Sequence, residues 1–477
     1  MRAVDLKAHF QGGGQVLKTR DDHALVFLNR TADSAAADQF TLPTESECSW
    51  VKPEEAFGPE KLRARIEPWL TALVQSEHLS LLVGSGLTHA VHRLGTGTIL
   101  PGMATVPAQF LNDEIEREAT RTAKTAGREE GNFEDQIRVA QELLRGLEIL
   151  ASSKADGSAE QQQASAMRNY LQDTLQAFTK SILQGEHNLA TADVGRRENA
   201  FNYLVSFLMS FASRAGTRER LQLFTTNYDR FIEAGADAAG LRLIDRFVGT
   251  LAPVFRASRL DIDLHYNPPG IRGEPRYLEG VARFTKLHGS VDWLVCDGTI
   301  RRIGLPFGAD ETVPYLKAPG LSGVDASRLM IYPNAAKDRE TAAYPYVELF
   351  RDFAAAICRP NSTVVCYGYS FGDDHINRVI EDMMTIPSAH LVIIAYDDPL
   401  GRIVRTYERL GRQAQITLLI GNHLGDLHTL VDHYLPKPAI DRTTFRMAEI
   451  LKARWGTEPR ISNDGENAVA GDGSPMS

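Results

Sequence analysis

The chain has 477 residues, of which 43% are hydrophobic and 24% are charged. These proportions are ordinary for a globular protein, so the chain is expected to bury a sizeable core, and disorder throughout is excluded. The formal net charge of −9 argues against a general nucleic-acid binder, because phosphate contacts require a surplus of Lys and Arg on one face. The sequence has no apolar run of about 18 residues and no signal-peptide pattern, so we expect a cytoplasmic protein without a membrane span.

Residues 1–75 combine a glycine run, one β-like run and a helix-like stretch at their end. No residue pattern in this segment indicates a chemistry. We interpret it as an N-terminal extension used for assembly or partner docking, with a merely structural flap as the alternative.

A strand-to-glycine transition follows at residues 80–90. The apolar run Leu81 to Val83 leads into Gly84-Ser85-Gly86 and then into a segment compatible with a helix. This order is typical of a buried parallel strand followed by a helix whose first amides face a phosphate, and Thr88 would add a hydroxyl. A tight turn without a ligand would show the same pattern, and His89 occupies the place of the third glycine of the dinucleotide motif.

Residues 105–220 carry apolar side chains at three- and four-residue spacing, which predicts an inserted helical lobe. Within it, Asn132-Phe-Glu-Asp135 favours a helix N-cap with acidic residues in the first turn. Residues 296–345 are expected to be rich in loops.

Further apolar runs downstream end in compact polar clusters. The clusters are Thr226-Asn-Tyr-Asp229, His288-Gly289 and Gly368-Tyr-Ser370. Ligands of parallel sheets bind outside the carboxyl ends of the strands, so these clusters should converge on one crevice. The sequence therefore predicts an α/β fold: a Rossmann-like parallel sheet with helices on both faces, a large inserted helical lobe and an N-terminal extension.

The four ordered motifs resemble those of sirtuins, and more closely those of the sirtuin-like NADases of bacterial antiphage defence. The resemblance covers roughly residues 78–425, within an expected catalytic domain at 76–435. Residues 436–477 are predicted to form a C-terminal helix and a flexible tail.

The resemblance implies that NAD is the substrate. Asn227 and His288 are the predicted catalytic residues: an amide at a strand end can orient a ribose or nicotinamide, and an imidazole can act as a base near neutral pH. Taken alone, Asn227 would indicate an Asx turn and His288 a structural histidine. The predicted NAD-binding residues are Gly84, Ser85, Gly86, Thr88, Thr226, Asp229, Gly368, Tyr369 and Ser370.

Departures from the sirtuin pattern favour hydrolysis of NAD over deacylation. Thr88 replaces the usual serine, the Gly-Ile-Pro-Asp-Phe-Arg segment is missing, and the four cysteines form no Cys-x-x-Cys pair. Neither cysteine pairs nor His/carboxylate clusters at ligand spacing indicate a metal, so none is predicted.

We therefore expect an NAD glycohydrolase that acts as an antiphage effector by depleting NAD. The alternatives are an NAD-dependent deacylase or ADP-ribosyltransferase, and a non-catalytic nucleotide-sensing subunit. The expected partners are further copies of the chain in a homo-oligomer and a HerA-type hexameric ATPase, with no membrane and no direct nucleic-acid contact.

Overall fold

The structure, a computed structural model, describes residues 6–437 apart from several short segments. These are residues 20–21, 32–37, 45, 47, 101–106, 109, 126–129, 215–217, 258–261, 267–275, 318–320, 322–328 and 332–344. Residues 1–436 form one compact unit. The predicted C-terminal helix and tail fall almost wholly outside the described residues.

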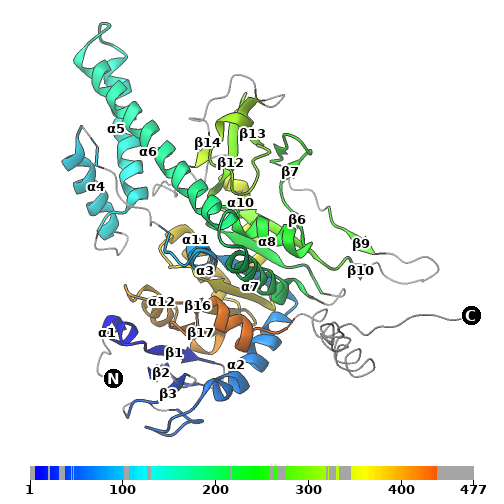
Figure 1. The fold of residues 1–477 in the computed structure, drawn as a ribbon. Coiled ribbons are helices and arrows are strands. Elements are labelled where there is room, and N and C mark those ends of the chain that lie inside the picture. Colours follow the sequence, from blue (N-terminus) through cyan, green and yellow to red (C-terminus); the bar gives the residue numbers. More distant parts are fainter. Residues whose placement is uncertain are drawn as a thin grey trace, which may run out of the picture. The chain divides into compact units, whose positions relative to one another are not determined.

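A ten-stranded sheet forms the centre of this unit, in the order β3-β2-β1-β17-β16-β15-β4-β5-β11-β6 (Figure 1). The strands from β17 to β6 run parallel to one another, whereas β1 to β3 are antiparallel. The strand bounds are β1 Gln15–Lys18, β2 Val26–Thr31, β3 Gln39–Thr41, β4 His78–Val83, β5 Gln222–Thr225, β6 Arg242–Ile244, β11 Val281–Lys286, β15 Ser362–Tyr367, β16 His390–Ala395 and β17 Ile416–Ile420.

Helices cover both faces of the sheet, because successive side chains of each parallel strand point to opposite sides. In β4, Leu81 and Val83 belong to the apolar cluster on one face, and Leu82 belongs to the cluster on the other. The first cluster includes residues of α2 Pro59–Val74, α3 Ser85–Thr96, α7 Val194–Ala212 and α8 Phe231–Ala239, and the second those of α10 Tyr346–Ile357, α11 Asp374–Met384 and α12 Arg402–Leu410. The predicted Rossmann-like α/β fold is confirmed.

The strand order reverses at β4. From β4 the chain continues to β5 on one side of it, and it later enters β15 on the other side. In open α/β sheets such a switch point opens a crevice between the loops that follow the two adjacent strands. Those loops begin at Gly84 and Gly368, so the topology brings two of the four predicted motifs together.

The inserted lobe consists of α4 Asn112–Thr125, α5 Phe133–Ala151 and α6 Ala159–Ala190, which project beyond the sheet in Figure 1. The predicted N-cap is confirmed, because Asn132 and Asp135 form a reciprocal capping box at the start of α5. Helix α7 also lies within the range predicted for the lobe, and it packs on the sheet against α3. No described helix, not even α6 with its 32 residues, has the length and apolar character needed to cross a bilayer.

A second, antiparallel sheet has the strand order β14-β12-β13-β8-β7. Only a few of its residues lie within 296–345, the region that we expected to be rich in loops. Its strands are β7 Phe247–Val248, β8 Val254–Phe255, β12 Gly289–Cys296, β13 Thr299–Arg302 and β14 Leu329–Ile331. The remaining described elements of the chain are α1 Leu6–Gln11, β9 His265–Tyr266, β10 Arg276–Tyr277, α13 Leu427–Thr429 and the short helical turns at Val313–Lys317, Gln413–Gln415 and Leu430–Tyr434.

The N-terminal extension is built into the main sheet. Strand β1 pairs with β17, and Leu17 and Phe40 are fully buried in the core. The imidazole of His423 adds polar contacts at this edge, at 2.7 Å from both the Asp38 carboxylate and the Tyr434 hydroxyl. The segment is thus part of the fold, and its use in docking stays a prediction.

This placement predicts that Leu17→Ala lowers the free energy of unfolding by about 2–5 kcal/mol, as expected for a buried leucine. Lys7→Ala, at an exposed position of α1, should change it by less than about 0.5 kcal/mol. Urea unfolding measures both. Equal, small effects would show that residues 1–75 are an appendage rather than part of the core.

Candidate active site

The loops after β4 and β15 meet through backbone atoms of glycine. The amide of Gly86 donates to the carbonyl of Gly368 at 3.0 Å. A Cβ atom on Gly84 would lie 2.4 Å from that carbonyl oxygen, and one on Gly86 would lie 2.6 Å from the Cα of Gly368. The protein therefore needs these glycines for its own packing, as the alternative of a tight turn without a ligand would also require.

The N-terminus of α3 lies where these two loops meet. Gly84 is its N-cap residue, no side chain caps it, and Ser85 in the first turn is exposed. The first amides of a helix carry partial positive charge and bind phosphate groups well. The amides of Gly86 and Leu87 already donate to the carbonyls of Gly368 and Gly84, so phosphate binding by this segment stays a prediction.

Asn227 joins the end of β5 to the loop after β4. Its Nδ2 atom donates to the Gly84 carbonyl and to the Thr88 hydroxyl, each at 3.0 Å. The Thr88 hydroxyl in turn donates to the Asp229 carboxylate at 2.7 Å. Because the amide nitrogen is engaged within the protein, a direct contact of Asn227 with a ligand would use Oδ1.

His288 lies between β11 and β12 and is 6% exposed. Its Nε2 atom is 3.3 Å from Nε2 of His375, and the ring of Tyr228 lies 6.3 Å away. One potential ligand atom of Asp373 and one ring nitrogen of each histidine lie within 4.8 Å of one another. The structure thus brings together three potential metal ligands that the spacing along the chain did not reveal.

His375 and Asp373 are the residues that the sequence reasoning missed. Both stand at the start of α11, directly after the Gly368-Tyr-Ser370 motif. Asp373 is the N-cap residue of α11, although its side chain does not cap the helix. The Asp-x-His pattern beside a strand-end motif was the available signal.

The remaining predicted residues differ in their surroundings. Ser370 is exposed and Thr226 is half-buried, its amide donating to the Val83 carbonyl. The Tyr369 ring is buried, and its hydroxyl donates to Asn377 at 3.2 Å. A ligand contact of Tyr369 would therefore use its backbone.

Two buried basic side chains, Lys286 and Arg230, fix the position of the loop that follows β5. Lys286 donates to the carbonyl of Asp229 and forms an ion pair with Glu233. Arg230 pairs with the buried Glu186 of α6. Burial raises the pKa of Glu186, and the adjacent guanidinium opposes that rise. A charge pair of this kind becomes costly if either partner is removed, so it fixes the loop and the lobe together.

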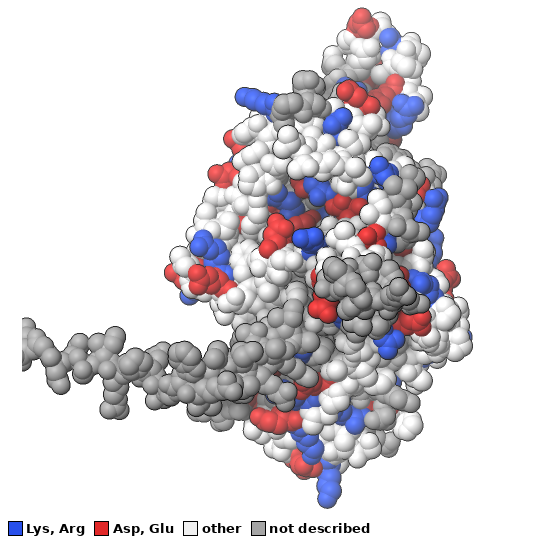
Figure 2. All heavy atoms as spheres, turned by 90° about the vertical axis from the view of Figure 1, so that its right-hand side faces the viewer, with Lys and Arg blue, Asp and Glu red and all other residues white. Residues whose placement is uncertain are grey.

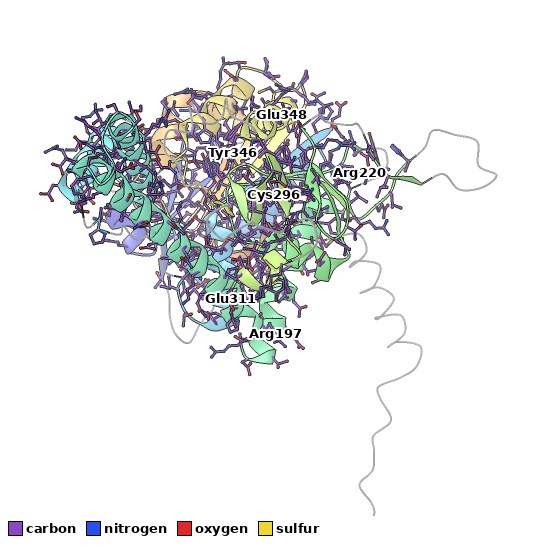
Figure 3. All side chains as sticks on the ribbon, turned by 90° about the horizontal axis from the view of Figure 1, so that it is seen from above. Arg197, Arg220, Cys296, Glu311, Tyr346 and Glu348 are labelled. Atoms are coloured by element: carbon purple, nitrogen blue, oxygen red, sulfur yellow. The ribbon has the colours of Figure 1, made fainter. Side chains whose placement is uncertain are left out.

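The inserted lobe also borders the site through aromatic rings. Phe178 of α6 lies edge-to-face with Tyr228 at 5.7 Å between centroids. Burial raises the pKa of the Tyr228 hydroxyl, and the nearby Glu134 carboxylate, at the start of α5, raises it further. Tyr346, labelled near the middle of Figure 3, starts α10 and also lies close enough to Tyr228 to affect its pKa. Tyr228 therefore stays protonated at neutral pH.

A separate cavity of about 800 Å³ lies on the α8 side of β11. Its lining includes Arg246 and Trp293 but none of the residues predicted to bind NAD. We place the candidate site at the switch point rather than in this cavity, because the predicted strand-end clusters meet there. On the face shown in Figure 2, acidic and basic side chains are interspersed, so the described part of that face presents mixed charge.

Comparison with known families supports a sirtuin-like assignment for the core. The model of the SIR2-like domain matches residues 222–419, from the start of β5 into β17. This range contains Asn227, His288 and Gly368, whereas Gly84 lies before it. The match supports an NAD-related activity. No curated protein matches the chain.

The glycine contact generates a prediction with a matched control. Gly368 and Gly411 both have φ of +61°, but only Gly368 has a neighbour within 4 Å of an added Cβ. Gly411→Ala should cost about 1–2 kcal/mol in unfolding free energy from backbone strain alone. Gly368→Ala should cost about 1–3 kcal/mol more from overpacking against Gly86. Denaturant unfolding measures the free-energy cost of each variant. Equal costs for the two variants would show that the loops after β4 and β15 tolerate separation.

Proposed function

We propose that the protein is an NAD glycohydrolase that cleaves NAD to nicotinamide and ADP-ribose. The observation that carries this proposal is the convergence of Gly84, Asn227 and His288 at the switch point of the sheet. The sequence motifs point to each of these residues, and the SIR2-like match covers Asn227 and His288.

In the proposed complex, the pyrophosphate lies at the N-terminus of α3. The network of Asn227, Thr88 and Asp229 would set the position of the nicotinamide ribose, since three hydrogen bonds of 2.7–3.0 Å hold it rigidly. Rigid placement of the reacting sugar lowers the barrier by removing motions that otherwise must be frozen in the transition state.

The bond that breaks joins the nicotinamide nitrogen to the anomeric carbon. It breaks through an oxocarbenium-like state, nicotinamide leaves as a neutral molecule, and a water oxygen bonds to the anomeric carbon. His288 would accept the proton that this water loses. The protonated Tyr228 and the apolar rings of the lobe would limit the entry of other nucleophiles.

Water is the proposed nucleophile because the chain departs from acyl-peptide-binding sirtuins. None of its four cysteines forms a Cys-x-x-Cys pair, so the zinc-bound lobe that clamps the peptide in deacylases has no counterpart in the sequence. Formation of an acyl-ADP-ribose product from NAD and an acyl-peptide would instead support the deacylase alternative.

The cellular role that we propose is depletion of NAD during phage infection, in a homo-oligomer joined by a HerA-type hexameric ATPase. The motif resemblance to sirtuin-like defence proteins supports this role and this partner. Free NAD would be consumed only after activation of the assembly.

The catalytic proposal predicts that His288→Ala lowers nicotinamide release by the activated complex about 10²–10⁴-fold. Asn227→Ala should lower nicotinamide release similarly. The loss of activity in the double variant should be far smaller than the product of the two single losses, because both residues serve one ribose. His428→Ala, at a half-exposed surface position, is the control. If both alanine variants keep their fold and release nicotinamide at the parental rate, the active site lies elsewhere.

The assembly proposal predicts a mass above that of one 52.7 kDa chain at micromolar concentration. Native mass spectrometry of the complex recovered from cells measures the number of copies and identifies the partner. A monomer that carries no ATPase would contradict this part of the proposal and would leave the catalytic part standing.

A further inference from the structure

Three side chains at the centre of the site form a group suited to bind a metal ion. His288 comes from the turn between β11 and β12, and Asp373 and His375 come from the start of α11. One potential ligand atom from each residue lies within 4.8 Å of the other two. His288 is buried, and the other two residues are half-buried, so the group is neither closed off nor freely hydrated.

The two imidazoles already have the spacing that a metal requires. Their Nε2 atoms lie 3.3 Å apart. Two zinc–nitrogen bonds of about 2.0–2.1 Å that meet near the tetrahedral angle place their nitrogens about 3.3 Å apart. A hydrogen bond between two neutral imidazoles would give the same distance. The position of the third side chain is therefore needed to distinguish a metal site from such a hydrogen bond.

Asp373 supplies that third observation. It is the N-cap residue of α11, a position from which aspartate normally accepts a hydrogen bond from the first turn. Its side chain makes no such bond, and its carboxylate lies near the two histidines instead. Two neutral imidazoles and one carboxylate form the ligand set of known zinc sites with three protein ligands.

We propose that His288, Asp373 and His375 bind a divalent transition-metal ion, with zinc as the ion tested. Nitrogen ligands select ions such as zinc or cobalt over magnesium and calcium, which prefer sites made of oxygen. This proposal replaces the expectation of no metal, which was drawn from spacing along the chain.

The proposal also has a consequence that rests on the proposed function. A metal ion on Nε2 of His288 occupies the lone pair that would otherwise accept a proton. Bound zinc and the base role of His288 therefore exclude each other, so zinc should inhibit nicotinamide release.

Calorimetric titration of the full-length, chelator-treated protein with zinc chloride tests the site without any turnover. We expect one ion per chain at this site, and the visible absorption of cobalt(II) in its place should show tetrahedral coordination. His375→Ala and Asp373→Asn should each weaken binding at least about tenfold, since the loss of even a supporting partner of a ligand costs about 10–100-fold. His428→Ala, which removes a surface histidine, should bind as the parent does.

Circular dichroism identifies variants that fail to fold, and His375→Gln replaces His375→Ala if that variant does. Zinc binding that is unchanged in both the His375 variant and Asp373→Asn overturns the proposal, as does binding of magnesium or calcium alone. Zinc that binds as expected but leaves nicotinamide release unchanged overturns only the inhibitory consequence. Failure of the glycohydrolase proposal itself would appear as no nicotinamide release by the metal-free activated complex, with binding intact.

Discussion

The backbone contact between Gly86 and Gly368 is the constraint on which the site depends. It joins the loops that follow β4 and β15, the two strands between which the topology of the sheet reverses. Because both residues lack a Cβ atom, the backbones of the two loops can come into direct contact. The hydrogen bond from Asn227 to the Gly84 carbonyl then adds the loop after β5 to the same group. A change that separates the two glycines would therefore displace several site residues at once.

Buried charges support this arrangement from outside the crevice. The pairs Lys286–Glu233 and Arg230–Glu186 hold the loop after β5, and the second pair ties it to the long helix of the inserted lobe. An unpaired charge in such a place would be strongly destabilising, so each pair restricts where the loop can lie. The lobe is thereby fixed beside Tyr228. This coupling offers a route by which a partner that moves the lobe would alter the site.

The parallel core and its strand-end clusters were predictable because each rests on a local pattern. An apolar run followed by Gly84 or by Asn227 marks a buried strand and the end of that strand, and parallel strands place those ends together. The N-terminal strands were not placed in the sheet, since β1 pairs with β17 some 400 residues away. The proximity of His288 and His375 was missed for the same reason: 87 positions separate them in the chain.

A crystal structure with carba-NAD, a non-hydrolysable analogue, would show whether NAD binds at the switch point of the sheet. We expect the pyrophosphate to lie at the N-terminus of α3 and the nicotinamide ribose to lie beside Asn227 and His288. An analogue bound instead in the cavity lined by Arg246 and Trp293 would contradict this expectation.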